Sequence, residues 1–210
     1  MSGITNPFSF EFDGEENLRA IVANGKGGLL MSAHVGNWEV AGHLFDRLDV
    51  IVNVVMYDGE HQRLKDYLEN VTGGRNFNVI VVKDDLSHVY AIGEALQKNQ
   101  LVCLHADRFL PGNKTIENQL LGAAANFPVG PFVMAATFNV PVSFVFAFKE
   151  TSKHYHFYGS PMINFEKDRP KNEVIETLLK GFTGNLEELL KKYPEHWFNY
   201  YNFWEIDEHA

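Results

Sequence analysis

The sequence predicts one α/β domain built on a mostly parallel, mixed sheet that helices flank. Short apolar runs typical of buried strands alternate with longer stretches of helical spacing, almost from the start of the chain. Strands separated by helices need crossover connections, which favour a parallel sheet covered on both faces. The 210 residues show no repeat, linker or low-complexity segment, so we expect a single domain over residues 1–210.

The expected strands follow two patterns. Residues 8–12 (FSFEF) alternate polar and aromatic side chains, whereas the other strands are mostly apolar or β-branched runs. In chain order, the expected strands are 8–12, 29–33, 50–56, 78–82, 101–104, 141–148 and 154–158.

The expected helices have apolar residues three and four positions apart. In chain order, they are 16–24, 38–48, 62–71, 87–99, 130–138 and 173–192. Pro131 suits the first turn of its helix, and the last helix has the longest periodic pattern. Residues 111–127 contain turn residues without a clear period, and we expect them to be irregular.

Charge and cysteine content exclude some classes of protein. The net charge of −9 argues against a nucleic-acid-binding face and against docking on anionic lipid through charge alone. A single cysteine, Cys103, cannot form an internal disulfide, which fits a reducing compartment. We see neither a signal peptide nor a run of about 20 apolar residues. We therefore expect the chain in the cytosol or against a membrane.

The richest chemistry follows the second expected strand, 29–33. His34 leaves that strand, Gly36 and Asn37 suit a tight turn, and Glu39 falls in the first turn of the next helix. Ligands of open α/β sheets bind beyond the carboxyl ends of strands. A carboxylate on one imidazole nitrogen makes the other nitrogen a better base, as removal of a hydroxyl proton requires. A capped helix with an acidic first turn and an incidental histidine fits the same spacing.

Four blocks of this sequence resemble one family. The block GGLLMSAHVGNWEVAG resembles the His-x4-Asp/Glu block of the lysophospholipid/glycerolipid acyltransferase superfamily, closest to the bacterial lipid A biosynthesis (lauroyl/myristoyl) acyltransferases. Three further blocks agree in order: LVCLHADRF, LLGAAANFPVGPFVMAATFNVPVSFVFA and KKYPEHWFNYYNFW. The resemblance spans most of the chain and implies a glycerolipid-acyltransferase-like fold.

The resemblance also implies roles for single residues. His34 corresponds to the general base and Glu39 to its partner. Phe127, Pro128 and Gly130 match, together with Pro131, a turn that helps to shape the acceptor or donor pocket in the family. The substrate-binding residues that the resemblance suggests are Asn37, Asp107, Arg108, Phe127, Pro128 and Gly130.

The implied enzyme is an acyltransferase that moves a fatty acyl group from acyl-ACP or acyl-CoA to a hydroxyl of a lipid A precursor-like acceptor. The hydroxyl attacks the thioester directly, so the resemblance implies no acyl-enzyme, no metal and no cofactor. The implied partners are an acyl carrier protein or CoA thioester and a lipid acceptor, with no nucleic acid. The implied place is the cytoplasmic face of a Gram-negative inner membrane, without the N-terminal membrane segment that the family normally carries.

Two departures from the family pattern leave the acceptor open. Arg108 stands where the family commonly has Gln, and the segment MYDGEHQRLK lacks the usual Arg-Pro. Another acceptor, such as an aminolipid or a polyene pigment, is therefore an alternative. A non-catalytic lipid-binding protein on the same fold and a thioester hydrolase are further alternatives.

Three other features allow two interpretations. His154 and His156 share a strand face and could bind a metal with a third ligand, but no third ligand has suitable spacing, which favours a solvated face. His105 and Asp107 share a face and fit a pocket lining or a surface. The aromatic C-terminal segment 193–204 suits packing across the sheet edge or a membrane interface.

Overall fold

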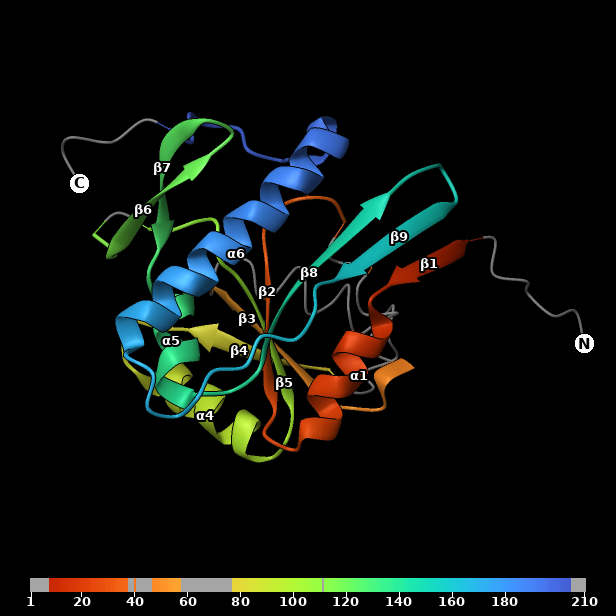
Figure 1. Ribbon diagram of the computed structural model, residues 1–210. Helices are drawn as coiled ribbons and strands as arrows, with labels where there is room; N and C mark the ends of the chain where they lie inside the picture. The colour runs from red at the N-terminus through yellow and green to blue at the C-terminus, as the bar shows by residue number, and fades with distance from the viewer. Residues whose placement is uncertain (1–7, 38–39, 41–46, 58–76, 111, 205–210) are drawn as a thin grey trace, which may run out of the picture.

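The computed structural model describes residues 8–37, 40, 47–57, 77–110 and 112–204 of the chain. Within them, a seven-stranded sheet in the order β1-β9-β8-β2-β5-β3-β4 forms the centre of the fold (Figure 1). Its strands are β1 (Ser9–Asp13), β2 (Gly28–Ser32), β3 (Val52–Tyr57), β4 (Phe77–Val82), β5 (Leu101–His105), β8 (Val142–Lys149) and β9 (His154–Gly159).

Neighbouring strands of this sheet are parallel except β8 and β9, which form an antiparallel pair. The antiparallel pair follows from the short turn between them, because a few residues can reverse the chain but cannot make a crossover. Strand β1 then pairs parallel to β9 at the sheet edge. The prediction of a mostly parallel, mixed sheet is therefore confirmed.

The described helices cover both faces of the sheet. They are α1 (Glu15–Asn24), α4 (Ser87–Gln97), α5 (Gly130–Phe138), α6 (Lys171–Lys192) and the short 3-10 helix η2 (Pro194–His196). The predicted helix 62–71 and most of the predicted helix 38–48 lie outside the described residues. No helix in the part of the chain that the structure describes is long and apolar enough to span a membrane.

The prediction of irregular structure over 111–127 is wrong. Strands β6 (Thr115–Leu120) and β7 (Ala123–Pro128) form an antiparallel hairpin. Its turn residues, Leu121 and Gly122, both have positive φ, at 53° and 85°. Such two-residue turns usually carry Asn-Gly or Gly-Gly, and leucine in the first position hides the signal in the sequence.

Contacts with the long helix α6 hold this hairpin in place. The Asn118 side chain donates a hydrogen bond to Thr183 Oγ1 (2.8 Å), and the Leu121 backbone N–H donates to Glu187 (3.0 Å). In Figure 1 the hairpin lies beside the C-terminal half of α6. The hairpin therefore depends on partners more than 60 residues away, which no local pattern could reveal.

The core has two parts, one on each face of the sheet. Side chains of α4, α5 and α6 pack on one face, and Leu18 and Ile21 of α1 pack on the other. The first part centres on Phe182, which is fully buried. The aromatic rings around Phe182, at centroid distances of 5.7–6.4 Å, are Phe127, Phe132, Phe144 and Phe146.

Replacing Phe182 with alanine should lower the free energy of unfolding by about 3–5 kcal/mol, because it leaves a cavity lined by four rings. Urea denaturation followed by circular dichroism measures this loss. The matched control is Tyr90→Ala on α4, whose side chain is 77% exposed and should cost little. Similar losses in the two variants would contradict the packing described here.

Candidate active site

Two neighbouring parallel strands bring the predicted site residues together. β2 and β5 pair with Ser32 opposite His105, and the Ala106 N–H donates to Ser32 O (2.9 Å) just beyond the strand ends. His34 lies two residues after β2, and Asp107 lies two residues after β5. Because the pair is parallel and in register, both side chains leave the same edge of the sheet. This edge is where open α/β sheets bind ligands.

The Asp107 carboxylate holds His34 at two points. Asp107 Oδ2 accepts the backbone N–H of His34 (2.9 Å), and Oδ1 lies 2.9 Å from His34 Nδ1. An ionised carboxylate can only accept, so Nδ1 carries the proton and Nε2 keeps its lone pair in the neutral ring. The geometry is that of an oriented imidazole base.

Asp107 stays ionised although it is almost completely buried, with 1% of its surface exposed. Burial alone would raise the pKa of this carboxyl group, but hydrogen bonds from His34 outweigh it, and the pKa is lowered. An ionised partner stabilises the imidazolium that forms when His34 accepts a proton.

A second histidine lies on the other nitrogen of His34. His105 Nδ1 is 3.1 Å from His34 Nε2, and the two rings meet at 64°. Burial, followed by the charge of His34, lowers the pKa of His105 to about 3. His105 is therefore neutral at physiological pH, and it adds no positive charge next to a protonated His34.

The turn after His34 is fixed by a close backbone approach. Gly36 has φ of 72°, and a Cβ at this position would lie 2.0 Å from the carbonyl oxygen of Ala147. Its N–H donates to His196 O (2.7 Å), and the Asn37 N–H donates to Ala147 O (2.6 Å). Glycine is required here for both its conformation and its lack of a side chain.

The C-terminal segment 194–204 packs over the same edge. The Phe198 N–H donates to His34 O (3.3 Å), and Val35 pairs with Trp197 in an isolated bridge. Arg108 Nη2 donates to Phe198 O (2.5 Å). The alternative that these aromatic residues pack across the sheet edge therefore holds for Trp197, which contacts the core.

Other aromatic and apolar side chains at this edge are exposed. Burial, followed by the negative charge of Asp107, raises the pKa of the Tyr201 hydroxyl. Tyr201 therefore lies near the Asp107 carboxylate. The exposed apolar and aromatic residues that follow β5 or belong to the C-terminal segment are Phe109, Leu110, Phe198, Tyr200 and Tyr201. We call these five residues the aromatic rim.

The remaining predicted site residues lie in different surroundings. Asn37 is partly buried in the turn, and Glu39 lies outside the described residues, so its pairing with His34 stays a prediction. Phe127 is fully buried in the core. Pro128 is buried at the end of β7, and Gly130 is exposed at the start of α5. Phe127 can therefore shape a pocket only through the residues that it supports.

Ligand atoms of His34, His105 and Asp107 lie within 4.8 Å of one another, close enough to hold a divalent cation. Those same nitrogens and oxygens are hydrogen-bonded to one another. Both oxygens of Asp107 accept hydrogen bonds from His34, so this cluster is better suited to orienting a histidine than to holding a metal. Cys103, considered as a nucleophile, is unsuited because burial raises the pKa of its thiol to about 12.

A family model described as bacterial lipid A biosynthesis acyltransferase matches residues 7–205. The chain belongs to this family. The resemblance seen in the four sequence blocks is therefore confirmed.

Two curated relatives match part of the chain. They are phosphatidylinositol mannoside acyltransferases of Mycobacterium tuberculosis, from strains ATCC 25618 / H37Rv and CDC 1551 / Oshkosh. Each is 31% identical over 127 residues, which is 58% of this chain and 39% of the relative. The match thus covers well under half of their length.

A solved structure shows the same fold. The 1-acyl-sn-glycerophosphate acyltransferase PlsC from Thermotoga maritima superposes with a TM-score of 0.55 at 9% identity, over 87% of this chain and 72% of that chain. At this identity the likeness concerns the fold alone, and it confirms the predicted glycerolipid-acyltransferase-like architecture.

Sequence reasoning did not foresee the hydrogen bonds of Asp107 and His105 to His34. The available signal was that both predicted strands end in chemistry-bearing residues, SAH and HAD. The sequence does not reveal the strand order. Only the pairing of β2 with β5 brings His105 and Asp107 next to His34, from which they are 71 and 73 positions away in the chain.

Neutral His105 predicts a pH dependence of stability. Its folded pKa, about 3, lies below the ordinary value near 6.5. Below pH 6.5 the unfolded chain therefore binds a proton that the folded chain does not, and stability falls as the pH falls. From pH 7 to pH 5, wild type should lose about 1–2 kcal/mol more than His105→Gln, measured by urea denaturation.

Between pH 7 and pH 8 both states keep His105 neutral, so the difference between the two proteins should stay constant there. An equal loss in both proteins on going to pH 5 would contradict the neutral, buried state of this ring.

Proposed function

We propose that this chain transfers a fatty acyl group from an acyl thioester to a hydroxyl group of a lipid, with His34 as the general base. The observation that carries the proposal is the doubly hydrogen-bonded pair of His34 and Asp107 at the carboxyl ends of β2 and β5. A buried carboxylate on Nδ1 keeps the ring proton there and leaves the lone pair on Nε2, as deprotonation of a hydroxyl requires.

The proposed reaction is a direct displacement. His34 Nε2 takes the proton of the acceptor hydroxyl while its oxygen attacks the thioester carbonyl. The tetrahedral intermediate then expels the thiolate, which takes up a proton, and the acyl ester remains on the acceptor. Ionised Asp107 stabilises the transient imidazolium, and the step needs neither an acyl-enzyme nor a metal.

His105 has a positioning role in this proposal. It holds Nε2 of His34 by a 3.1 Å contact until the acceptor hydroxyl replaces it. Because the pKa of His105 is about 3, its ring does not compete for the proton that His34 receives.

The acceptor is proposed to be a lipid with a sugar headgroup, such as a lipid A precursor. The family description and the relatives named for phosphatidylinositol mannoside support this class. Arg108 keeps further N–H groups besides the one bound to Phe198, and these could meet a phosphate of the headgroup. An aminolipid or polyene acceptor remains the alternative, and the donor is either acyl-ACP or acyl-CoA.

Peripheral contact with the inner membrane fits the aromatic rim. Its five side chains are 38–88% exposed, and Trp and Tyr residues favour the membrane–water interface. Phe198 ties the rim to His34 through its backbone. Contact at this edge would bring the acceptor headgroup to the base while the acyl chains stay in the lipid.

Release of free thiol from acyl-CoA and from acyl-ACP, with and without Gram-negative lipids, tests the proposed function. Wild type should release thiol only when lipid is present, and the labelled product then identifies the acceptor. His34→Ala should lower the rate by at least about 10³-fold, because it removes the base. Release without lipid would indicate a hydrolase, and binding of lipid without release would indicate a lipid-binding protein.

Asp107→Asn should lower the rate about 10³-fold while the fold is retained. If the amide oxygen of the introduced asparagine still accepts the hydrogen bond from the backbone N–H of His34, the amide NH₂ group faces Nδ1 of the ring. Nδ1 must then accept a hydrogen bond, so the ring proton moves to Nε2. The matched variant is Glu39→Gln, measured in the same assay. A larger loss for Glu39→Gln than for Asp107→Asn would show that Glu39, as first predicted, orients the base.

A further inference from the structure

Strands β1 and β9 lie at one side of the sheet, where β1 is the outermost strand, and they carry polar side chains on one face. The two strands run parallel, with Glu11 opposite His156 and Asp13 opposite Tyr158. Because side chains alternate across a strand, these four residues share one face. The other face of the same strands turns aromatic residues toward the core, namely Phe10, Phe12, Tyr155 and Phe157.

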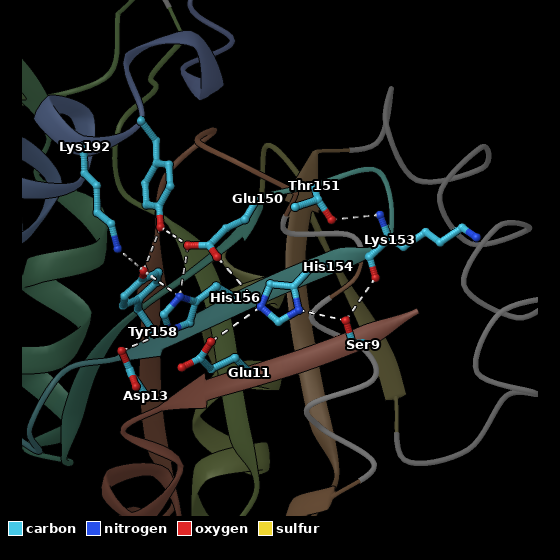
Figure 2. Close-up of polar contacts among 11 residues, drawn as sticks. Ser9, Glu11, Asp13, Glu150, Thr151, Lys153, His154, His156, Tyr158 and Lys192 are labelled. Carbon is cyan, nitrogen blue, oxygen red and sulfur yellow. Dashed lines mark hydrogen bonds and ion pairs between the residues drawn. The ribbon is translucent and has the colours of Figure 1, made fainter. Parts of the chain in front are cut away.

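His156 is the centre of this polar face. It is only 7% exposed, yet it is surrounded by carboxylates (Figure 2). Its Nε2 lies 3.0 Å from Asp13 Oδ2, and its Nδ1 lies 3.2 Å from Glu150 Oε1 and 2.9 Å from the Tyr158 hydroxyl. One atom each of Glu11, Asp13 and His156 lie within 4.8 Å of one another.

Glu150 contacts the His156 ring at Nδ1, the nitrogen that faces away from Asp13. Carboxylate oxygens face both ring nitrogens, Glu150 at Nδ1 and Asp13 at Nε2. A metal ion that binds Nε2 would replace the proton shared with Asp13, while Glu150 accepts the proton on Nδ1. Metal-binding histidines commonly have this arrangement, in which an outer carboxylate orients the ligand and makes it more basic. Glu150 is itself held by a hydrogen bond from the Tyr193 hydroxyl, which lies at the end of α6.

The two carboxylates of β1 lack a full counter-charge. Their side chains are 58% and 61% exposed. Their ion-pair partners are histidines: His154 Nε2 lies 3.5 Å from Glu11 Oε2, and His156 pairs with Asp13. Within residues 8–37, 40, 47–57, 77–110 and 112–204, neither carboxylate forms an ion pair with Lys or Arg. A divalent cation would neutralise both.

We propose that Glu11, Asp13 and His156 form a binding site for one divalent transition-metal ion, with Zn²⁺ as the best match. One imidazole nitrogen and two carboxylate oxygens suit zinc, whereas Mg²⁺ and Ca²⁺ prefer oxygen ligands alone. This site is separate from the His34–Asp107 pair and does not depend on the proposed function.

The distances fit such an ion after a small movement. Zinc–ligand bonds of about 2.0–2.1 Å in a tetrahedral site place the ligand atoms about 3.3 Å apart. His156 Nε2 and Asp13 Oδ2 are already 3.0 Å apart. Glu11 is exposed and can close the remaining gap by rotating its side chain, and water would complete the coordination.

The ion would join the N-terminal edge strand to the rest of the sheet. Glu11 and Asp13 come from β1, and His156 comes from β9, 143 residues beyond Asp13. A ligand that binds only the folded chain stabilises it. Zinc binding should therefore raise the melting temperature as well as give a stoichiometric binding signal.

Calorimetric titration of the untagged, chelator-treated protein with ZnCl₂ tests the proposal, together with thermal unfolding. Wild type should bind one ion at this site and melt about 5 °C higher in excess zinc. His156→Gln and Asp13→Asn should lose both effects. MgCl₂ at the same concentration should have neither.

Two controls separate this site from other sources of binding. Asp168→Asn removes an exposed carboxylate elsewhere and should behave as wild type. His34→Ala disrupts the second histidine–carboxylate cluster and should leave the β1–β9 binding intact. No zinc binding by wild type, or binding that persists unchanged in both His156→Gln and Asp13→Asn, would overturn the proposal and leave a hydrogen-bonded charge cluster only.

Discussion

The structure of the site depends on one buried carboxylate. Asp107 accepts two hydrogen bonds from a single residue, from the backbone N–H of His34 and from its ring, and so ties the ends of β2 and β5 together. Burial of an ion costs free energy unless it is paired and hydrogen-bonded. Both conditions are met by His34, so the interaction that stabilises the strand ends also orients the proposed base.

The surrounding chain makes this arrangement rigid from the other side. Gly36 lies against the backbone of β8, and segment 194–204 hydrogen-bonds to both His34 and Gly36. The Trp204 indole N–H donates to Leu120 O (3.1 Å), which connects the same segment to the β6–β7 hairpin. Elements distant in sequence thus meet at one edge of the sheet, and this edge carries both the proposed base and the aromatic rim.

The sequence predicts what local patterns determine and misses what pairing determines. Alternation and periodicity predicted every strand of the central sheet, and the block around His34 led to the family. The β6–β7 hairpin was missed because Leu121 adopts a positive φ that sequence statistics assign to Asn or Gly. The carboxylates beside His156 were missed for a different reason, since Glu11 and Asp13 become its neighbours only through parallel pairing of the first and last strands.

The central claim is that Asp107 fixes the tautomer of His34, and ¹⁵N NMR of histidine-labelled protein at neutral pH tests it most directly. We expect neutral His34 with a proton on Nδ1 and a bare Nε2, and we expect the proton to move to Nε2 in Asp107→Asn. A His34 ring protonated at Nε2 in the wild type, or one that ignores Asp107→Asn, would contradict the account.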